Sequence, residues 1–296
     1  MGRWFIMSVS QLRHYIMAIA YLNGEWMAPE DAKVSVFDRG FMFGDGIYEV
    51  MAVYDGHIFT LDQHLVRLNR SLDSIRLPSP LDDAGWQALL QEAVDRAHEN
   101  PAYLYLQVTR GAASPRSHVY PREIRPTVLI TVMEAPILKR DAVTPYKVMT
   151  REDFRWGRGD IKVVSLIANG LLKNEALDAG FDDAILVRNG QVTEATASNV
   201  FIVKDGVVVT PPKSSFLLHG ITRDHVISLL RQAEMPLEER NFSEQELLAA
   251  DEVWITSTGH EVWPVSQVND QVIGNGAAGV VWQAVDRLFQ DSKHSS

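Results

Sequence analysis

The chain has 296 residues and a formal net charge of -10, with 46% hydrophobic and 22% charged residues. This length and composition are typical of a globular protein that buries a large core in one large domain or two modest ones. The acidic charge is spread along the chain, which argues against a nucleic-acid partner because such a partner requires a basic surface. The chain has no cysteine, which excludes disulfides, thiolate metal sites and a cysteine nucleophile and fits a cytoplasmic location.

The first residues, 1–17, are interpreted as an N-terminal extension. Gln11, Arg13 and His14 interrupt the apolar stretch near the start, so an extension is favoured over a signal peptide. A start codon placed too early is the alternative. No apolar run approaches the roughly 20 residues that span a bilayer, and no membrane segment is predicted. The fold itself is expected to begin with a strand at 18–22.

Hairpin signals recur along the chain. Two-residue turns of the Asn-Gly or Asp-Gly type, which accommodate positive φ, separate segments rich in β-branched residues. They are Asn23-Gly24, Asp55-Gly56, Asn189-Gly190 and Asp205-Gly206. Further strands are predicted at 103–109, 127–132 and 252–255, so much of the protein should be sheet.

Helical periodicity separates these strands. It predicts helices at 61–75, 82–99, 168–179, 221–233, 243–249 and 277–289. Strands and helices in blocks, without strict βαβ alternation, indicate an α+β fold. The segment 134–146, with Pro136 and Pro145, is typical of a linker. We therefore predict a small N-terminal domain at 18–138 and a larger C-terminal domain at 139–296.

Three segments of the N-terminal half carry polar groups that could bind a ligand. The strand after the glycine turn at 44–46 places Tyr48 and Val50 on one face, and this segment lacks the glycine spacing of a nucleotide loop. Arg67, on the following helix, could bind a phosphate, although a solvated helix arginine is the simpler reading. The loop at 110–118 brings Arg110, Arg116 and His118 together, which suits either a carboxylate site or a solvated loop.

Lys162 and Glu194 offer an amine nucleophile and a carboxylate. These are the two protein groups on which pyridoxal 5'-phosphate chemistry depends. Acidic residues number 38 of 296, so a lysine and a carboxylate at this spacing are not evidence by themselves. The function of this pair therefore depends on the residues around it.

Two segments of the C-terminal half could bind an anion. The run 220–223 precedes an amphipathic helix, where free N–H groups, the positive end of the dipole and the Thr222 hydroxyl coincide. The turn at 256–259 adds the hydroxyls of Ser257 and Thr258. A routine threonine and an ordinary polar turn are the alternatives. The histidines lack metal-site spacing and no G-x-S-x-G is present, so neither a metal site nor a hydrolase is predicted.

Taken in order, these segments resemble the fold type IV pyridoxal-phosphate enzymes, the family of D-amino acid aminotransferases, branched-chain aminotransferases and aminodeoxychorismate lyase. The resemblance covers residues 18–288, and five concordant motifs carry it. They are 37–49, His64-x-x-Arg67-Leu68, Asp160-Ile161-Lys162, Glu194 with Ser198-Asn199-Val200-Phe201, and Gly220-Ile221-Thr222-Arg223.

The resemblance implies a two-domain α+β fold with antiparallel and mixed sheets, flanking helices and bound pyridoxal 5'-phosphate. Lys162 would bind the cofactor covalently from the C-terminal domain and act as the catalytic base. Glu194 would pair with the pyridine nitrogen. The other implied cofactor contacts are Arg67, Ser198, Ile221, Thr222, Ser257 and Thr258.

The pair Arg116-x-His118 is similar to the D-amino acid aminotransferase signature, in which it binds the substrate carboxylate together with a tyrosine that matches Tyr48. Val50 is the other implied substrate contact. Because this loop reaches into the partner subunit in the family, the resemblance also implies a homodimer whose active sites are completed by the partner chain.

The implied reaction is that of a D-alanine transaminase. D-alanine and 2-oxoglutarate would give pyruvate and D-glutamate. A branched-chain L-amino acid aminotransferase, an aminodeoxychorismate lyase and a non-catalytic binding protein on the same scaffold are the alternatives.

Overall fold

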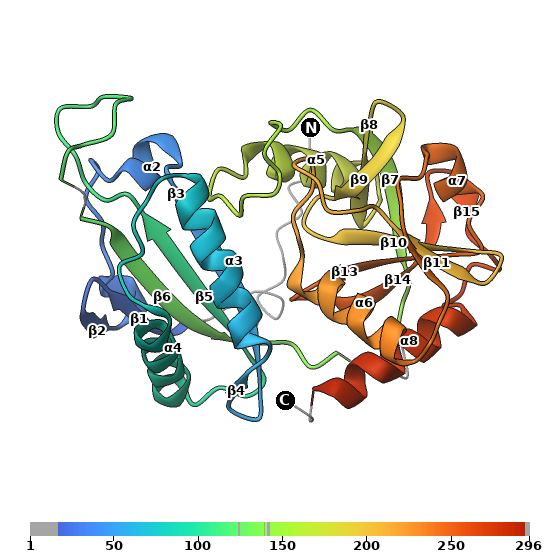
Figure 1. Ribbon diagram of the computed structural model, residues 1–296, viewed down its shortest axis with the longest axis horizontal. Helices are drawn as coiled ribbons and strands as arrows, with labels where there is room; N and C mark the ends of the chain where they lie inside the picture. The colour runs from blue at the N-terminus through green and yellow to red at the C-terminus, as the bar shows by residue number, and fades with distance from the viewer. Residues whose placement is uncertain (1–16, 124, 139, 141–142, 294–296) are drawn as a thin grey trace, which may run out of the picture. The chain divides into compact units, whose positions relative to one another are not determined.

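The computed structural model describes residues 17–123, 125–138, 140 and 143–293. The chain divides into two compact units, one formed by residues 1–137 with 162–165 and the other by residues 138–161 with 166–296 (Figure 1). These are the first unit and the second unit. The predicted N-terminal extension lies outside the described residues except for Met17, and so does Lys139, where the predicted C-terminal domain begins.

The first unit contains an antiparallel sheet of six strands in the order β2-β1-β6-β5-β3-β4. The strands are β1 (Met17–Leu22), β2 (Glu25–Met27), β3 (Gly46–Tyr54), β4 (His57–Ile58), β5 (Ala102–Thr109) and β6 (Thr127–Glu134). The helical segments are η2 (Pro29–Asp31), α2 (Arg39–Phe43), α3 (Leu61–Ser74) and α4 (Asp83–Ala97).

The two long helices of this unit pack against its sheet, α3 on β3 and α4 on β6. Burial along β5 alternates, with Leu104 and Leu106 fully buried and Tyr105 only partly buried, as expected of a sheet with one covered face. In β3 the same alternation buries Glu49 and leaves Tyr48 and Val50 on the opposite face. The strand thus separates a buried polar group from the predicted substrate contacts.

The second unit contains a mixed sheet of nine strands. Its order is β12-β11-β10-β13-β14-β7-β8-β9, and β15 pairs with β14. The strands are β7 (Tyr146–Glu152), β8 (Asp183–Arg188), β9 (Gln191–Ala195), β10 (Asn199–Lys204), β11 (Val207–Thr210), β12 (Leu237–Glu239), β13 (Glu252–Ser257), β14 (Glu261–Val268) and β15 (Gln271–Val272). Strand β7 runs parallel to β8 and β14, and β11 runs parallel to β12.

Among the described residues, four α-helices accompany this sheet. They are α5 (Ile167–Asp178), α6 (Ile221–Gln232), α7 (Glu244–Leu248) and α8 (Val280–Ser292). Helix α5 packs on β8 and β7, while α6 and α8 pack on each other and on β13 (Figure 1). A capping box of Ser243 and Glu246 begins α7. The core between the layers is built from buried aliphatic side chains such as Val200, Ile202 and Ile255.

The predicted fold class is confirmed. Each of the four Asn-Gly and Asp-Gly pairs joins two neighbouring strands of a hairpin, and both of its residues have positive φ. All six predicted helices are present, with ends shifted by at most three residues. None of the helices in the described part of the chain is both long and apolar enough to cross a membrane.

Candidate active site

Lys162 belongs to the first unit, although the residues before and after its short segment belong to the second. Its carbonyl oxygen accepts a hydrogen bond from the N–H of Tyr48 at 3.0 Å, and the N–H of Val164 donates to the Gly46 carbonyl at 3.1 Å. Backbone pairing with β3 therefore places Lys162 in the first unit, whereas the prediction counted it with residues 139–296.

The Lys162 amine lies on the face of β3 that carries Tyr48. Its Nζ is 4.2 Å from the centroid of the Tyr48 ring, which stacks on Tyr105 with centroids 5.7 Å apart. A cation above an aromatic face is attracted by the ring quadrupole. The first unit thus brings the predicted nucleophile and one predicted substrate contact together.

On the opposite face of β3, Glu49 forms a buried polar cluster with α3. Its carboxylate accepts hydrogen bonds from Arg67 Nε at 2.8 Å and Arg67 Nη2 at 2.6 Å, and His64 Nδ1 lies 2.8 Å from Oε2. Burial alone would raise the pKa of Glu49, but the Arg67 charge and the hydrogen bonds from Arg67 and His64 lower it to about 2. Burial lowers the pKa of His64, so the ring is neutral at pH 7 and donates from Nδ1 to the carboxylate.

Arg67, the predicted phosphate ligand, thus donates two hydrogen bonds to Glu49, a residue for which no role was predicted. A signal was present, since His64 and Arg67 are three residues apart on one helical face and Glu49 is an inward residue of a neighbouring strand. A fixed, permanently charged guanidinium is the type of group that binds a phosphate.

The loop after β5 separates its two arginines. Arg110 is buried, donates from Nε and Nη2 to Asp45 at 2.9 Å and 3.0 Å, and also donates to the backbone carbonyls of Ile75 and Arg76. Its guanidinium carbon lies 3.6 Å from the centroid of the Tyr120 ring. Arg110 is therefore a structural residue, which corrects the idea that both arginines of this loop could bind a carboxylate.

Arg116 and His118, by contrast, are exposed and share one aromatic support. The Arg116 guanidinium carbon lies 4.5 Å from the centroid of the Phe43 ring, and the His118 ring lies 5.6 Å from it. Arg39 holds the backbone between them, donating to the Ser117 carbonyl at 2.5 Å and to Asp45 at 2.7 Å. The predicted carboxylate-binding pair is thus fixed by residues that the sequence reasoning had left without a role.

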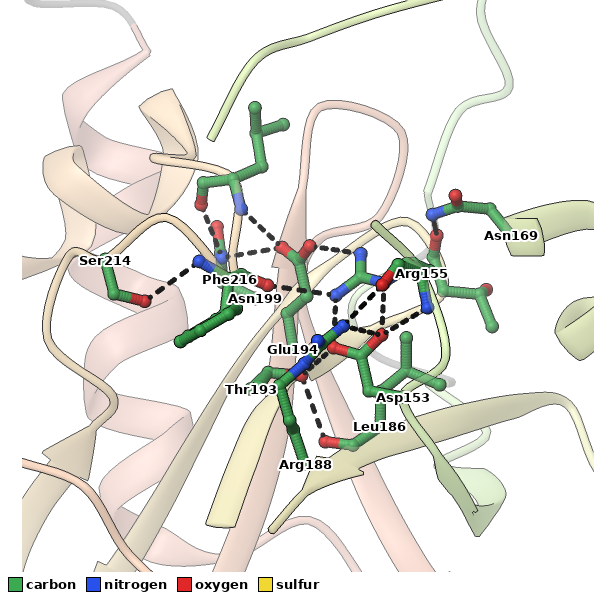
Figure 2. A network of polar contacts seen from close by, with 12 residues as sticks. Asp153, Arg155, Asn169, Leu186, Arg188, Thr193, Glu194, Asn199, Ser214 and Phe216 are labelled. Carbon is green, nitrogen blue, oxygen red and sulfur yellow. Dashed lines mark hydrogen bonds and ion pairs between the residues drawn. The ribbon is translucent and has the colours of Figure 1, made fainter. Parts of the chain in front are cut away.

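Glu194 lies in a buried polar network of the second unit (Figure 2). Its Oε1 accepts from Arg155 Nη1 at 2.5 Å, and its Oε2 accepts from the Leu218 N–H at 3.0 Å and from Asn199 Nδ2 at 3.3 Å. Arg155 in turn donates from Nε and Nη2 to Asp153 at 2.9 Å and 3.0 Å. Sequence reasoning missed Arg155, because nothing in its spacing identifies Glu194 as its partner.

Burial raises the pKa of Glu194, and this effect outweighs the opposing charge of Arg155 and the hydrogen bond from Leu218. Arg155 lies between two carboxylates, which raise the pKa of its guanidinium although burial opposes this. A carboxylate with raised proton affinity is a strong acceptor for an N–H group. Glu194 is therefore fixed in place and suited to pair with a protonated ring nitrogen.

The N-terminus of α6 is held next to this carboxylate. Asn199 donates from Nδ2 both to Glu194 and, at 2.9 Å, to the Leu218 carbonyl. The N-cap residue of α6 is Gly220, and a Cβ at this position would lie 2.0 Å from Asn199 Oδ1. Because glycine also has no side chain to cap the helix, the first N–H groups of α6, at Ile221 and Thr222, suit an anion.

The sheet register brings the remaining predicted cofactor contacts to the same end of two strands. Asn199 of β10 pairs with Thr256 of β13, so Ser198 and Ser257 lie at neighbouring strand ends. Ser198 is buried, and Ser257 Oγ accepts a hydrogen bond from the His260 N–H at 3.1 Å. Thr258 follows in the turn before β14. The second unit thus contains Glu194 and the donors suited to a phosphate.

Comparison with known proteins identifies the family. The model of the family described as amino-transferase class IV matches residues 46–268. The chain belongs to this family. It is 41% identical to a D-alanine aminotransferase of Bacillus licheniformis over 91% of this chain and 95% of the relative. It is 38% identical to a D-alanine aminotransferase of Listeria monocytogenes over 90% and 93% of the two chains.

Solved structures show the same fold. A branched-chain amino acid aminotransferase of Escherichia coli matches with a TM-score of 0.86 and 26% identity, over 93% of this chain and 94% of the other. A second branched-chain amino acid aminotransferase, solved with pyridoxamine 5'-phosphate, matches with a TM-score of 0.86, 28% identity and the same coverage. A third, from the thermophilic archaeon Thermoproteus uzoniensis, matches with a TM-score of 0.82 and 26% identity, again over 93% and 94% of the two chains. The prediction of a fold type IV enzyme is confirmed.

Proposed function

We propose that this protein is a pyridoxal-phosphate-dependent D-amino acid aminotransferase. It transfers the amino group of a D-amino acid such as D-alanine to a 2-oxo acid such as 2-oxoglutarate, giving pyruvate and D-glutamate. The observation that carries the proposal is the 41% identity to a D-alanine aminotransferase over 91% of this chain. The exposure of Arg116 and His118 above Phe43 supports it, since two cationic or donor groups on one support can bind a carboxylate.

The residues present fit the cofactor by the chemistry of their donors and acceptors. Glu194 is a buried acceptor for a ring N–H, and the uncapped start of α6 provides N–H donors for a phosphate. Ser198, Ser257, Thr258 and Arg67 complete the proposed set. When bound, pyridoxal 5'-phosphate supplies an aldehyde that condenses with amines and a ring that accepts electrons.

Lys162 has two proposed tasks. Its amine would hold the cofactor through the aldehyde, and as a free amine it would move the proton at the substrate α-carbon. The Tyr48 ring packs against this amine, and Tyr48 and Val50 face the substrate. Arg116 and His118 bind the substrate carboxylate and so select the hand of the α-carbon.

We further propose that the chain is a homodimer whose carboxylate-binding loop completes the active site of the partner chain. The exposure of Phe41 and Val119, which lie on α2 and on this loop, supports an interface there. The cysteine-free composition supports the proposed cytoplasmic location.

One experiment tests the activity. The cofactor-loaded protein is mixed with D-alanine or with L-leucine in the absence of any 2-oxo acid, and the loss of the aldehyde form of the cofactor is followed by absorbance. We expect D-alanine to convert the cofactor and release one pyruvate per site, whereas L-leucine should leave it unchanged. Conversion by L-leucine alone would instead identify the branched-chain activity that the solved structural neighbours have.

A further inference from the structure

The proposed phosphate donor Ser257 begins a chain of three polar side chains, all within the second unit. The His260 ring folds back over the turn between β13 and β14, so that its Nδ1 lies 3.3 Å from Ser257 Oγ. Its Nε2 lies 2.8 Å from the hydroxyl of Tyr146, the first residue of β7. The Tyr146 and Trp263 rings flank the imidazole, with centroids 5.4 Å and 6.1 Å from it.

Two arrangements of protons are compatible with these contacts. In one, Tyr146 donates to Nε2 and Nδ1–H donates to Ser257. In the other, Ser257 donates to Nδ1 and Nε2–H donates to Tyr146. The imidazole carries a single proton, because burial lowers the pKa of His260. The two arrangements have opposite consequences for Ser257, since a hydroxyl has one proton to donate and two lone pairs that accept.

The distances favour donation by tyrosine. A phenol is a stronger donor than an aliphatic hydroxyl, and the contact at Nε2 is 2.8 Å whereas that at Nδ1 is 3.3 Å. Ser257 Oγ then accepts from Nδ1–H and from the His260 backbone N–H, which occupies both of its lone pairs. Its own proton has to point elsewhere.

We propose that Tyr146 and His260 form a relay that fixes the Ser257 hydroxyl as a pure donor toward the phosphate of the cofactor. Both are positioning residues that act through Ser257. The proposal rests on the proposed function, in which Ser257 binds that phosphate. It adds a role for two side chains that lie behind the donor and for the tautomer of one of them.

The tautomer is measured directly by NMR of the cofactor-loaded protein labelled with ¹⁵N-histidine. We expect His260 to carry its proton on Nδ1, and we expect Tyr146→Phe to shift it toward Nε2. A wild-type His260 that is protonated on Nε2 would overturn the relay, because the Ser257 hydroxyl would then donate its hydrogen bond to His260 Nδ1. A purely structural role for Tyr146 would leave the tautomer unchanged.

Affinity measurements give the second test. Apoprotein is titrated with pyridoxal 5'-phosphate and, separately, with pyridoxal, which has no phosphate. We expect His260→Phe to raise the Kd for pyridoxal 5'-phosphate roughly 2- to 10-fold, the effect of one ordinary hydrogen bond, and to leave the Kd for pyridoxal unchanged. Equal losses for the two ligands, or none for either in a folded variant, would contradict the proposal.

A double-mutant cycle separates this proposal from the proposed function. If His260 acts through Ser257, the variant Ser257→Ala with His260→Phe should bind no more weakly than Ser257→Ala alone. Additive losses would refute the relay. If Ser257→Ala by itself has no effect, the phosphate assignment fails instead. His225→Phe is the matched control, because His225 Nε2 also lies 2.8 Å from a serine hydroxyl, that of Ser292, and its loss should leave the Kd unchanged.

Discussion

Replacing Glu49 with glutamine should destabilise the first unit by about 3 kcal/mol at neutral pH. Glu49 is fully buried, and its pKa falls from 4.5 to about 2, chiefly because Arg67 opposes the effect of burial. At 1.36 kcal/mol per tenfold change in proton affinity, this difference corresponds to about 3 kcal/mol. Removing one partner of a buried ion pair typically lowers the free energy of unfolding by about 3–5 kcal/mol, and the value for Glu49 agrees with this range.

The sign of the pH dependence follows from the lowered pKa. A group whose folded-state pKa lies below its unfolded value stabilises the fold fully above the unfolded pKa, here about 4.5, and ceases to do so as the pH falls through about 2. The stability difference between wild type and Glu49→Gln should therefore be largest at pH 7 and shrink below pH 4.5. Because both proteins carry the same other titrating groups, the difference isolates Glu49.

Urea unfolding followed by circular dichroism at pH 7 and at several acidic pH values measures this difference. Glu92→Gln is the control, since Glu92 pairs with Arg96 on α4 and the two side chains are 45% and 47% exposed. It should cost no more than about 0.5 kcal/mol. A loss below about 1 kcal/mol for Glu49→Gln at pH 7, or one that does not depend on pH, would refute the ion-pair argument.

Four further substitutions test the roles proposed for individual residues. Lys162→Ala should remove the visible absorbance of the bound cofactor and lower turnover by more than roughly 10²- to 10⁴-fold, and turnover at the wild-type rate would exclude it as the nucleophile. Arg116→Ala should lower kcat/KM for D-alanine roughly 10- to 150-fold at unchanged stability. Arg110→Ala should instead lower the free energy of unfolding by about 3–5 kcal/mol. The opposite pattern would make Arg110 the carboxylate ligand and Arg116 the structural residue. Gly220→Ala should weaken cofactor binding, because the new Cβ would lie 2.0 Å from Asn199 Oδ1. Titration of the apoprotein with the cofactor measures this loss. An unchanged affinity would argue against the N-terminus of α6 as the phosphate site.

Local chemistry was predictable from the sequence. Asn-Gly and Asp-Gly pairs force positive φ within two residues, and all four produce the hairpins expected of them. The six periodic segments form helices as predicted. They were predictable because an apolar stripe at helical spacing depends only on residues three or four apart in the chain. These signals depend on neighbours in the chain, so tertiary structure had little to change.

The different environments of similar residues were not predictable from local spacing. Arg110 and Arg116 lie six residues apart in one loop, yet one is buried against Asp45 and the other is exposed above Phe43. Lys162 pairs with β3 of the first unit, and Glu194 is held by Arg155, 39 residues earlier in the chain. In each case the partner is distant in sequence.

The sequence by itself therefore determined the fold class, the order of the elements and which residue types were available for the chemistry. Only the tertiary structure decided which charged groups are fixed by a buried counter-charge and which face outward. The physical reason is that turn and helix preferences are local, whereas desolvation and ion pairing depend on which side chains the sheets bring together.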